Sequence, residues 1–298
     1  MTRIVLSAHG FRLSVAPDFG ANITGMDWID EAGRVVPILR ACNDDQLVPH
    51  TPSPVGCFPM APFANRIDGG IFSFGGRIHV LPVNRPDENV AIHGLSRFES
   101  FDLISHTDST LSLLHRYRGD VFAYDLAQEF RLDPSGVSTQ LTIINQGDRM
   151  PFGLGLHPYF VREETARLHF RASFLSQAEE RHLPARFISS QSGPKFSAGA
   201  LLDELDDFDG HYASWEPRCA VLDRPGAGIR VILSAAGAFS NLHVYVPPGG
   251  GFVCIEPVSH VPDVHNRTIL AGFGDLVSLR TGDVLSGSMH ISASQLMP

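Results

Sequence analysis

Three segments of the sequence place side chains that can move protons or bind hydroxyl groups between rigid turn formers. The first, residues 57–76, sets Asn65 and Arg66 between an aromatic, proline-rich stretch and a pair of glycines. The planar guanidinium of Arg66 offers several N–H donors to the oxygens of a small neutral ligand. An ion pair between Arg66 and Asp68 across the turn is the alternative interpretation, and this segment alone leaves both open.

Two histidines stand next to residues that restrict or free the backbone. His93 precedes Gly94, and a glycine lets the backbone approach a ligand closely. His157 follows a glycine-rich stretch and precedes Pro158, which favours an extended conformation for the histidine and removes one backbone donor. An imidazole in this position can act as a general acid. A buried histidine bonded to a backbone carbonyl is the alternative.

The third segment, residues 251–267, carries a carboxylate on an otherwise apolar strand. Val253 and Ile255 share one face, so Cys254 and Glu256 share the other. Burying an unpaired carboxylate is costly, so Glu256 requires a partner or a chemical task. Burial is expected to raise its pKa, which suits a general base. A structural ion pair is the alternative.

Other catalytic chemistries find little support in the sequence. His260 and His265 lie near Asp263, but in a loop that crosses Pro262, so they do not present two ligands at helical spacing. The glycine pairs lack the strand–helix setting of a dinucleotide-binding loop, and no Gly-x-Ser-x-Gly elbow occurs. We therefore predict no metal and no cofactor.

The elements that must position these groups are predicted to be strands. Apolar and polar residues alternate with a period of two in four segments, residues 125–132, 137–144, 167–174 and 241–247. Each is expected to bury one face and to leave the other for solvent or function. The chain holds 28 glycines and 21 prolines, spread along its length, which suits many short strands joined by turns. The best helix candidates, residues 185–191 and 199–205, are short.

These patterns predict an all-β fold, a large antiparallel β-sandwich, because so many antiparallel strands must stack or curl. No linker or internal repeat divides the chain, so residues 1–298 are expected to form a single domain. A net charge of −9 disfavours nucleic acid as a partner. The first residues lack the apolar region of a signal peptide, so none is expected, and no apolar run is long enough to span a membrane. The four cysteines form no CxxC pair, and we expect free thiols and a cytoplasmic location.

Five short motifs follow one another between about residues 10 and 290. They are Asn65-Arg66-Ile67, His93-Gly94, His157-Pro158-Tyr159-Phe160, Asp209-Gly210-His211-Tyr212 and Glu256-Pro257. In this order they resemble the aldose 1-epimerase (galactose mutarotase) family. The resemblance implies a β-sandwich of the galactose mutarotase-like type. It also implies interconversion of the α and β anomers of an aldose without metal or nucleotide, by a monomer or homodimer whose partner is a monosaccharide.

The resemblance also implies roles for individual residues. Glu256 resembles the family's general base, and His157 resembles its general acid. The residues expected to bind and position the sugar are Asn65, Arg66, His93 and Asp209. Several acidic residues lie between 203 and 209; Asp209 is chosen because an aromatic residue, Tyr212, stands three positions later.

Aromatic side chains are candidates for covering the apolar face of a pyranose ring. Phe63, Tyr159 and Phe160 lie within the matching motifs or beside them. Core packing is the alternative for each of the three.

Two alternative functions stay open. Leu95 follows Gly94 where many family members have a second glycine, and residues 93–98 also resemble hexose-6-phosphate epimerases. That alternative predicts two or more basic residues near the pocket, with Arg85 and Arg97 as candidates. The other is a non-catalytic sugar-binding protein, which has no need of both His157 and Glu256.

Overall fold

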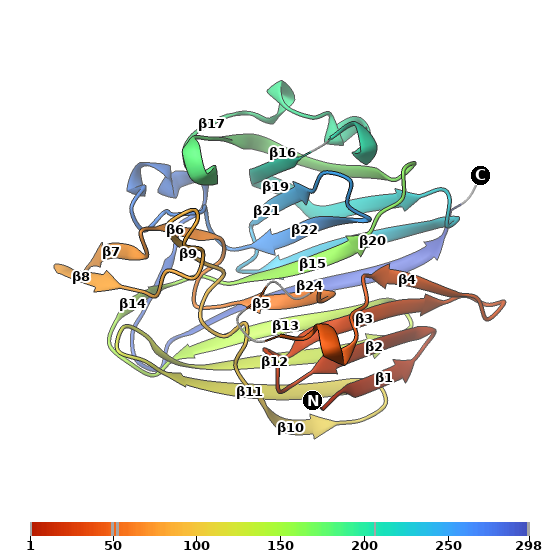
Figure 1. The fold of residues 1–298 in the computed structure, drawn as a ribbon, viewed down its shortest axis with the longest axis horizontal. Helices are drawn as coiled ribbons and strands as arrows, with labels where there is room; N and C mark the ends of the chain where they lie inside the picture. The colour runs from red at the N-terminus through yellow and green to blue at the C-terminus, as the bar shows by residue number, and fades with distance from the viewer. Residues whose placement is uncertain (1, 49–50, 52–53, 206, 297–298) are drawn as a thin grey trace.

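Antiparallel strands dominate the computed structural model, which describes residues 2–48, 51, 54–205 and 207–296. Hydrogen bonds join 18 strands into one continuous sheet (Figure 1). These strands are β1 (Ile4–Ala8), β2 (Phe11–Ala16), β3 (Asn22–Ile29), β4 (Val35–Leu39), β5 (Cys57–Met60), β10 (Asp102–His106), β11 (Thr110–Arg118), β12 (Ala123–Asp133), β13 (Gly136–Asn145), β15 (Gly155–Val161), β16 (Arg167–Ala178), β17 (Pro184–Ser189), β18 (Ala200–Leu201), β19 (Phe208–Arg224), β20 (Ile229–Gly237), β21 (Asn241–Val246), β22 (Phe252–Val258) and β24 (Val284–Gln295).

Three further strand pairs form separate two-stranded sheets. β14 (Met150–Phe152) pairs with β23 (Val277–Leu279), and β6 (Arg66–Asp68) pairs with β9 (Val90–Ile92). The hairpin of β7 (Ile71–Phe74) and β8 (Arg77–Val80) projects from one end of the molecule (Figure 1).

One edge of β19 pairs with β16, and its other edge divides its hydrogen bonds between two runs of strands. Its first half pairs with β21, which continues through β22, β15, β5, β3 and β2 to β1. Its second half pairs with β20, which continues through β24, β13, β12 and β11 to β10. The two runs are the layers of a large antiparallel β-sandwich, with β19 common to both. The predicted all-β sandwich is confirmed.

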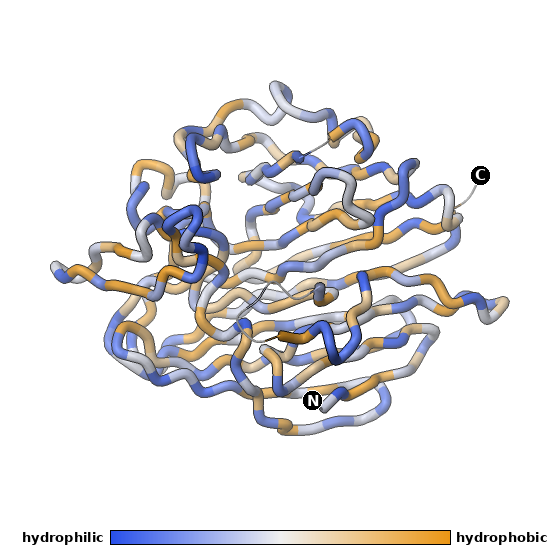
Figure 2. The backbone as a smooth tube through the Cα atoms, viewed as in Figure 1, coloured by the Kyte–Doolittle hydropathy of each residue, from blue (hydrophilic) through white to orange (hydrophobic). Residues whose placement is uncertain are grey.

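The core forms because the strands alternate as the sequence pattern predicts. Along β12, Tyr124, Leu126 and Phe130 are buried, whereas Glu129 and Arg131 face solvent. Figure 2 shows the same alternation of hydrophobic and hydrophilic residues along the backbone. Burying each large apolar side chain contributes about 1.5–3 kcal/mol, and the main core cluster draws such residues from strands throughout the chain.

Two local predictions were wrong. On β16 the alternation predicted to bury Phe174 shifts at a register irregularity between Phe170 and Ala172, so Leu175 is buried and Phe174 is partly exposed. The two helix candidates are not α-helical: residues 185–189 belong to β17, and the remaining residues form strand β18 and single 3₁₀ turns. Strand pairing with β16 overrides the weak local helix preference.

Short 3₁₀ turns are the helical elements of the described residues. They are η1 (Asp44–Gln46), η2 (Glu180–His182), η3 (Ser190–Ser192), η4 (Phe196–Ala198), η5 (Leu202–Glu204) and η6 (Thr268–Phe273). Within the described ranges, none of these helices has the length and apolar character needed to cross a membrane.

Candidate active site

Adjacent strands align three titratable side chains in a row. β15, β22 and β21 are neighbours, and the register of β15 on β22 places His157 opposite Glu256. The register of β21 on β22 places His243 opposite the same Glu256. Side chains that lie opposite each other on paired strands point to the same face of the sheet. Pro158 and Pro257 lack an N–H, so the hydrogen-bond ladder is interrupted at this level.

His157 and Glu256 contact each other directly. Nε2 of His157 lies 3.2 Å from Oε1 of Glu256, and both side chains are almost fully buried. Burial raises the pKa of Glu256 to about 8 and lowers the pKa of His157 well below its ordinary value. The buried pair therefore favours one shared proton, held on the carboxyl group while the imidazole is neutral.

Aromatic rings fix the orientation of the His157 imidazole. The ring stacks on Phe58 with centroids 4.5 Å apart and on Tyr159 with centroids 4.6 Å apart. The His93 ring meets it edge-on at 5.0 Å. The guanidinium of Arg97 in turn lies over the Phe58 ring, 3.9 Å from its centroid. These contacts limit the ring to one position without using its nitrogen atoms.

Asp209, on β19, lies among three groups that can be positively charged. His243 Nε2 is 2.8 Å from Oδ1, and His182 Nδ1 is 3.3 Å from Oδ2. An Arg66 nitrogen, Nη1, is 3.9 Å from the same Oδ2 atom. Burial opposes ionisation, yet the neighbouring His243 and Arg66 hold the pKa of Asp209 well below its usual range. Asp209 is thus an ionised acceptor for hydroxyl groups.

Arg66 is held by an asparagine and a glutamate. Its Nε donates to Oε2 of Glu88 at 2.7 Å. Oδ1 of Asn65 accepts from the backbone N–H of Arg66 at 2.9 Å and from Nη1 at 3.2 Å. The alternative of an ion pair between Arg66 and Asp68 is wrong, because Asp68 pairs with Arg181.

The His93-Gly94 turn brings an imidazole to the wall of the site. Both residues have positive φ, 62° and 77°. Nδ1 of His93 lies 2.9 Å from the sulfur of Met60. Burial, followed by the nearby His157, lowers the pKa of His93 well below its ordinary value, so this imidazole is neutral.

Replacing Gly94 by alanine is expected to destabilise the fold. A Cβ atom there would lie 2.1 Å from the Ala61 carbonyl oxygen, at a φ of +77° that alanine rarely adopts. Backbone strain and overpacking each cost about 1–3 kcal/mol, so denaturant unfolding of Gly94→Ala should show a loss of about 2 kcal/mol or more. Gly33→Ala is the control, because φ is +81° there and no atom lies within 4 Å of the added Cβ. Equal stability of the two variants would contradict the steric explanation.

All six residues predicted to form the site line one cavity of about 510 Å³. They are Asn65, Arg66, His93, His157, Asp209 and Glu256. This volume is within the range of small-molecule binding sites. Tyr159 lines the cavity as well. Phe63 and Phe160 are fully buried in the core instead, which confirms the alternative of core packing for these two residues. Phe160 follows Tyr159 on β15 and must point to the opposite face.

Sequence reasoning missed two histidines in the cavity, His182 and His243. The signal for His243 was present: it alternates with Leu242 and Val244, and the face opposite these apolar residues was expected to be wet or functional. His182 lies in a polar stretch without periodicity, where no pattern indicated its position. Arg85 and Arg97, the candidate basic residues, both line the cavity.

A potential metal-ligand group coincides with the proton-transferring pair. His157, Cys254 and Glu256 each place one ligand atom within 4.8 Å of the others, the one such group found in the described ranges. This agrees with the expectation that Cys254 and Glu256 share a face of β22. In the loop that carries His260 and Asp263, the Asp263 carboxylate forms an ion pair with Arg267.

Comparison with known proteins places the chain in a family. The family model described as aldose 1-epimerase matches residues 2–292. The chain belongs to the aldose 1-epimerase family. Among its relatives, YphB of Escherichia coli K12, an uncharacterized protein, is 29% identical over 99% of this chain and 100% of its own length. A second uncharacterized protein of that organism, YihR, is 28% identical over 43% of this chain and 44% of its own length.

Solved structures share this aldose 1-epimerase fold. A crystal structure of an aldose 1-epimerase candidate from Escherichia coli K12 superposes with a TM-score of 0.87, at 29% identity and 99% coverage of both chains. A galactose mutarotase-like protein from Clostridium acetobutylicum superposes with a TM-score of 0.85, at 17% identity, covering 98% of this chain and 95% of its own.

Proposed function

We propose that the protein interconverts the α and β anomers of a free aldose by general acid/base catalysis. The observation that carries the proposal is the buried contact of 3.2 Å between His157 Nε2 and Glu256 Oε1. This pair lines a cavity whose other polar groups, Asp209 and Arg66, suit sugar hydroxyls. Membership of the aldose 1-epimerase family supports the same reaction class.

The reaction needs one proton acceptor and one proton donor. The acceptor takes the proton of the C1 hydroxyl, the bond between C1 and the ring oxygen breaks, and the donor delivers a proton to the ring oxygen. The open aldehyde turns about the C1–C2 bond, and the ring oxygen then attacks the other face of C1. The two carriers exchange roles in this closing step, so that the protons return to their starting positions.

The proton held by the His157–Glu256 pair decides which partner begins as acid. The family resemblance implies Glu256 as base and His157 as acid, which requires the ionised form of the pair. Burial favours the neutral form, in which Glu256 donates and His157 accepts. Both forms carry one proton and interconvert by its transfer across the contact, so either supplies one acid and one base.

The test of this proposal is polarimetry on freshly dissolved α-D-glucose and α-D-galactose in a dilute, non-catalytic buffer. Faster relaxation to an unchanged final rotation would support anomer interconversion, and a panel with L-arabinose, D-xylose, L-fucose and glucose 6-phosphate would then rank substrates. Saturable sugar binding without acceleration of any of these sugars would instead favour a sugar-binding protein without catalytic activity and overturn the proposal.

The rate is expected to fall on both sides of the pH range in which the pair holds one proton. The pKa of Glu256 is raised to about 8, so raising the pH through 8 removes the shared proton and with it the acid. Above that pH, kcat/KM should fall tenfold per pH unit. The pKa of His157 lies below its ordinary value, so the pair binds a second proton, and the rate falls for that reason, only at acidic pH. A pH profile of polarimetric kcat/KM that stays flat from pH 7 to 10 would contradict this assignment.

A second candidate, an aldose carrying an anionic group, is favoured by one observation. Arg97 lines the cavity, and its guanidinium forms no ion pair with a carboxylate of the described residues. Its Nε atom is buried without a hydrogen-bond partner among them. Arg85 lies on the same wall but is paired with Glu88 at 3.5 Å. This is the basic pair that the hexose-6-phosphate alternative predicts.

Substrate competition separates the two candidates. If the substrate is a free aldose, inorganic phosphate should leave the rate unchanged, and Arg97→Met should affect glucose and glucose 6-phosphate equally. If the substrate is anionic, phosphate should inhibit the wild-type protein, and Arg97→Met should abolish the preference for glucose 6-phosphate. Arg116→Met is the control, since Arg116 pairs with Asp102 and does not line the cavity.

A further inference from the structure

The turn between β16 and β17 has an unusual backbone and borders the cavity. Arg181 and His182 both adopt the left-handed region, with φ of 61° and 58°. Residues other than glycine rarely adopt this backbone conformation. Two such residues in succession persist only where contacts with neighbouring residues hold the backbone in place. The backbone closes the turn with one hydrogen bond, from the N–H of Glu179 to the carbonyl of Leu183 at 2.8 Å.

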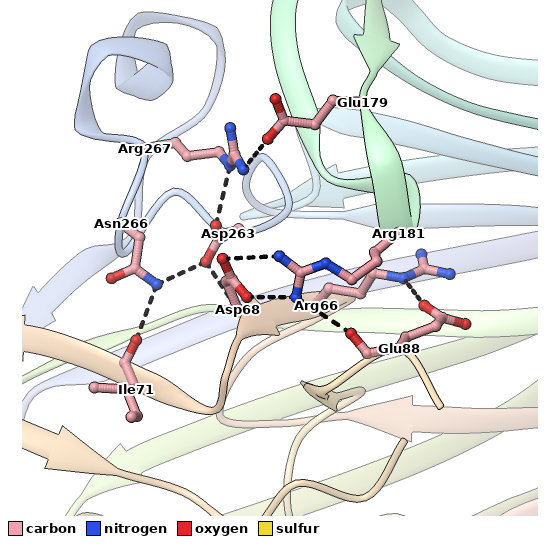
Figure 3. Close-up of polar contacts among 9 residues, drawn as sticks. All are labelled: Arg66, Asp68, Ile71, Glu88, Glu179, Arg181, Asp263, Asn266 and Arg267. Carbon is pink, nitrogen blue, oxygen red and sulfur yellow. Dashed lines mark hydrogen bonds and ion pairs between the residues drawn. The ribbon is translucent and has the colours of Figure 1, made fainter. Parts of the chain in front are cut away.

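Two ion pairs hold this turn against the body of the protein. Arg181 binds Asp68 through both terminal nitrogens, at 2.7 and 3.3 Å. On the other side of the turn, Glu179 pairs with Arg267. Figure 3 shows Arg181 directed at Asp68, and Arg267 placed between Glu179 and Asp263.

The two anchors belong to one connected network. Asp263 pairs with Arg267 at 3.1 Å through Oδ2, and its Oδ1 accepts from the backbone N–H of Asp68 at 3.1 Å. Arg181 also donates to the backbone carbonyl of Glu88 at 3.3 Å, and the Glu88 carboxylate binds Arg66. The turn is therefore linked to an arginine of the cavity itself (Figure 3).

The turn delivers His182 to the cavity. The side chain is 52% exposed, lines the cavity and places Nδ1 at 3.3 Å from Oδ2 of Asp209. Its Nε2 atom makes no hydrogen bond within the described ranges. When the imidazole is neutral and Nδ1, the nitrogen that faces Asp209, carries the proton, Nε2 is an acceptor for a hydroxyl group.

We propose that His182 is a further substrate-binding residue, which accepts a hydrogen bond from an aldose hydroxyl beside Asp209, and that Arg181 and Glu179 are its positioning residues. This inference rests on the proposed function and deepens it by naming a specificity-determining contact. The His182 contact lies at the exposed rim of the cavity, whereas His157 and Glu256 are buried. Loss of His182 should therefore weaken sugar binding without removing either proton carrier.

The experiment compares His182→Ala, Arg181→Ala and the double variant by polarimetry with the preferred aldose. His182→Ala should raise KM about tenfold, the loss of one well-placed hydrogen bond, with kcat nearly unchanged. Arg181→Ala should raise KM less, and Arg181→Lys should restore part of the loss. The double variant should match His182→Ala, because Arg181 acts through His182.

Controls separate this inference from general destabilisation and from the proposed function. Arg116→Ala removes an exposed ion pair of the same length, 2.7 Å, elsewhere on the sheet and should leave KM unchanged. An unchanged KM in His182→Ala, or additive effects in the double variant, would overturn the inference. If the wild-type protein accelerates no sugar but calorimetry detects binding that His182→Ala weakens, the proposed function fails and this contact stands.

Discussion

Glu256→Gln lowers kcat for anomer interconversion by about 10²–10⁴, the usual contribution of one positioned proton carrier, while sugar affinity stays within several-fold. Glutamine preserves the size of the side chain and a polar contact with His157, but it can neither accept nor release the proton that the reaction moves. The expected signature is thus a loss of kcat at nearly unchanged KM, measured by polarimetry.

The control for Glu256→Gln is the same substitution at another glutamate that lines the cavity. Glu99 also lines it but is exposed to solvent, so Glu99→Gln should retain normal activity. Circular dichroism and thermal unfolding must show that Glu256→Gln is folded. Activity equal to that of the wild-type protein would remove Glu256 from the mechanism.

His157→Asn is the second substitution with a large expected effect. Asparagine keeps a polar group near Glu256 but does not titrate, so the pair no longer contains two proton carriers. We expect kcat to fall by about 10²–10⁴. The stacking on Phe58 and Tyr159 is also lost, so a modest loss of stability should accompany the change.

Two measurements separate the catalytic loss in His157→Asn from the structural one. His290→Asn removes another histidine, on β24 and bonded to Ser138, and should not alter the rate. Sugar binding by the folded His157→Asn protein should stay within several-fold of the wild-type value. Retention of most of the kcat would show that His157 only packs in the cavity wall.

The sequence was most informative where residue chemistry and strand periodicity agreed. His157 and Glu256 were predicted from their neighbours, and the strand pairing of β15 with β22 brings them opposite each other. Asp209 was selected from several acidic residues, and it is the one paired with His243. The predicted fold class follows from the same alternation, because it repeats along most of the chain.

The remaining features depend on pairing that no single segment encodes. Phe160 was a candidate for covering a sugar, but the direction in which it points is decided by the partner strands of β15. Phe174 is displaced from its predicted face by an irregularity set by β19. His182 is brought to Asp209 by the ion pairs that its neighbours Arg181 and Glu179 form with residues far away in the chain, Asp68 and Arg267.

The shared strand β19 has a consequence for how the protein reaches its native state. The pairing of β5 with β15, for example, joins segments that lie about one hundred residues apart in the chain. Closing such long loops slows folding, because chain entropy is lost before the contacts are gained. Asp209 lies in the half of β19 that pairs with β21, whereas Tyr117, which also lines the cavity, stands on β11 in the other run, so the cavity lining is completed only when both layers have joined. Recovery of activity during refolding should therefore lag behind the return of β-sheet circular dichroism.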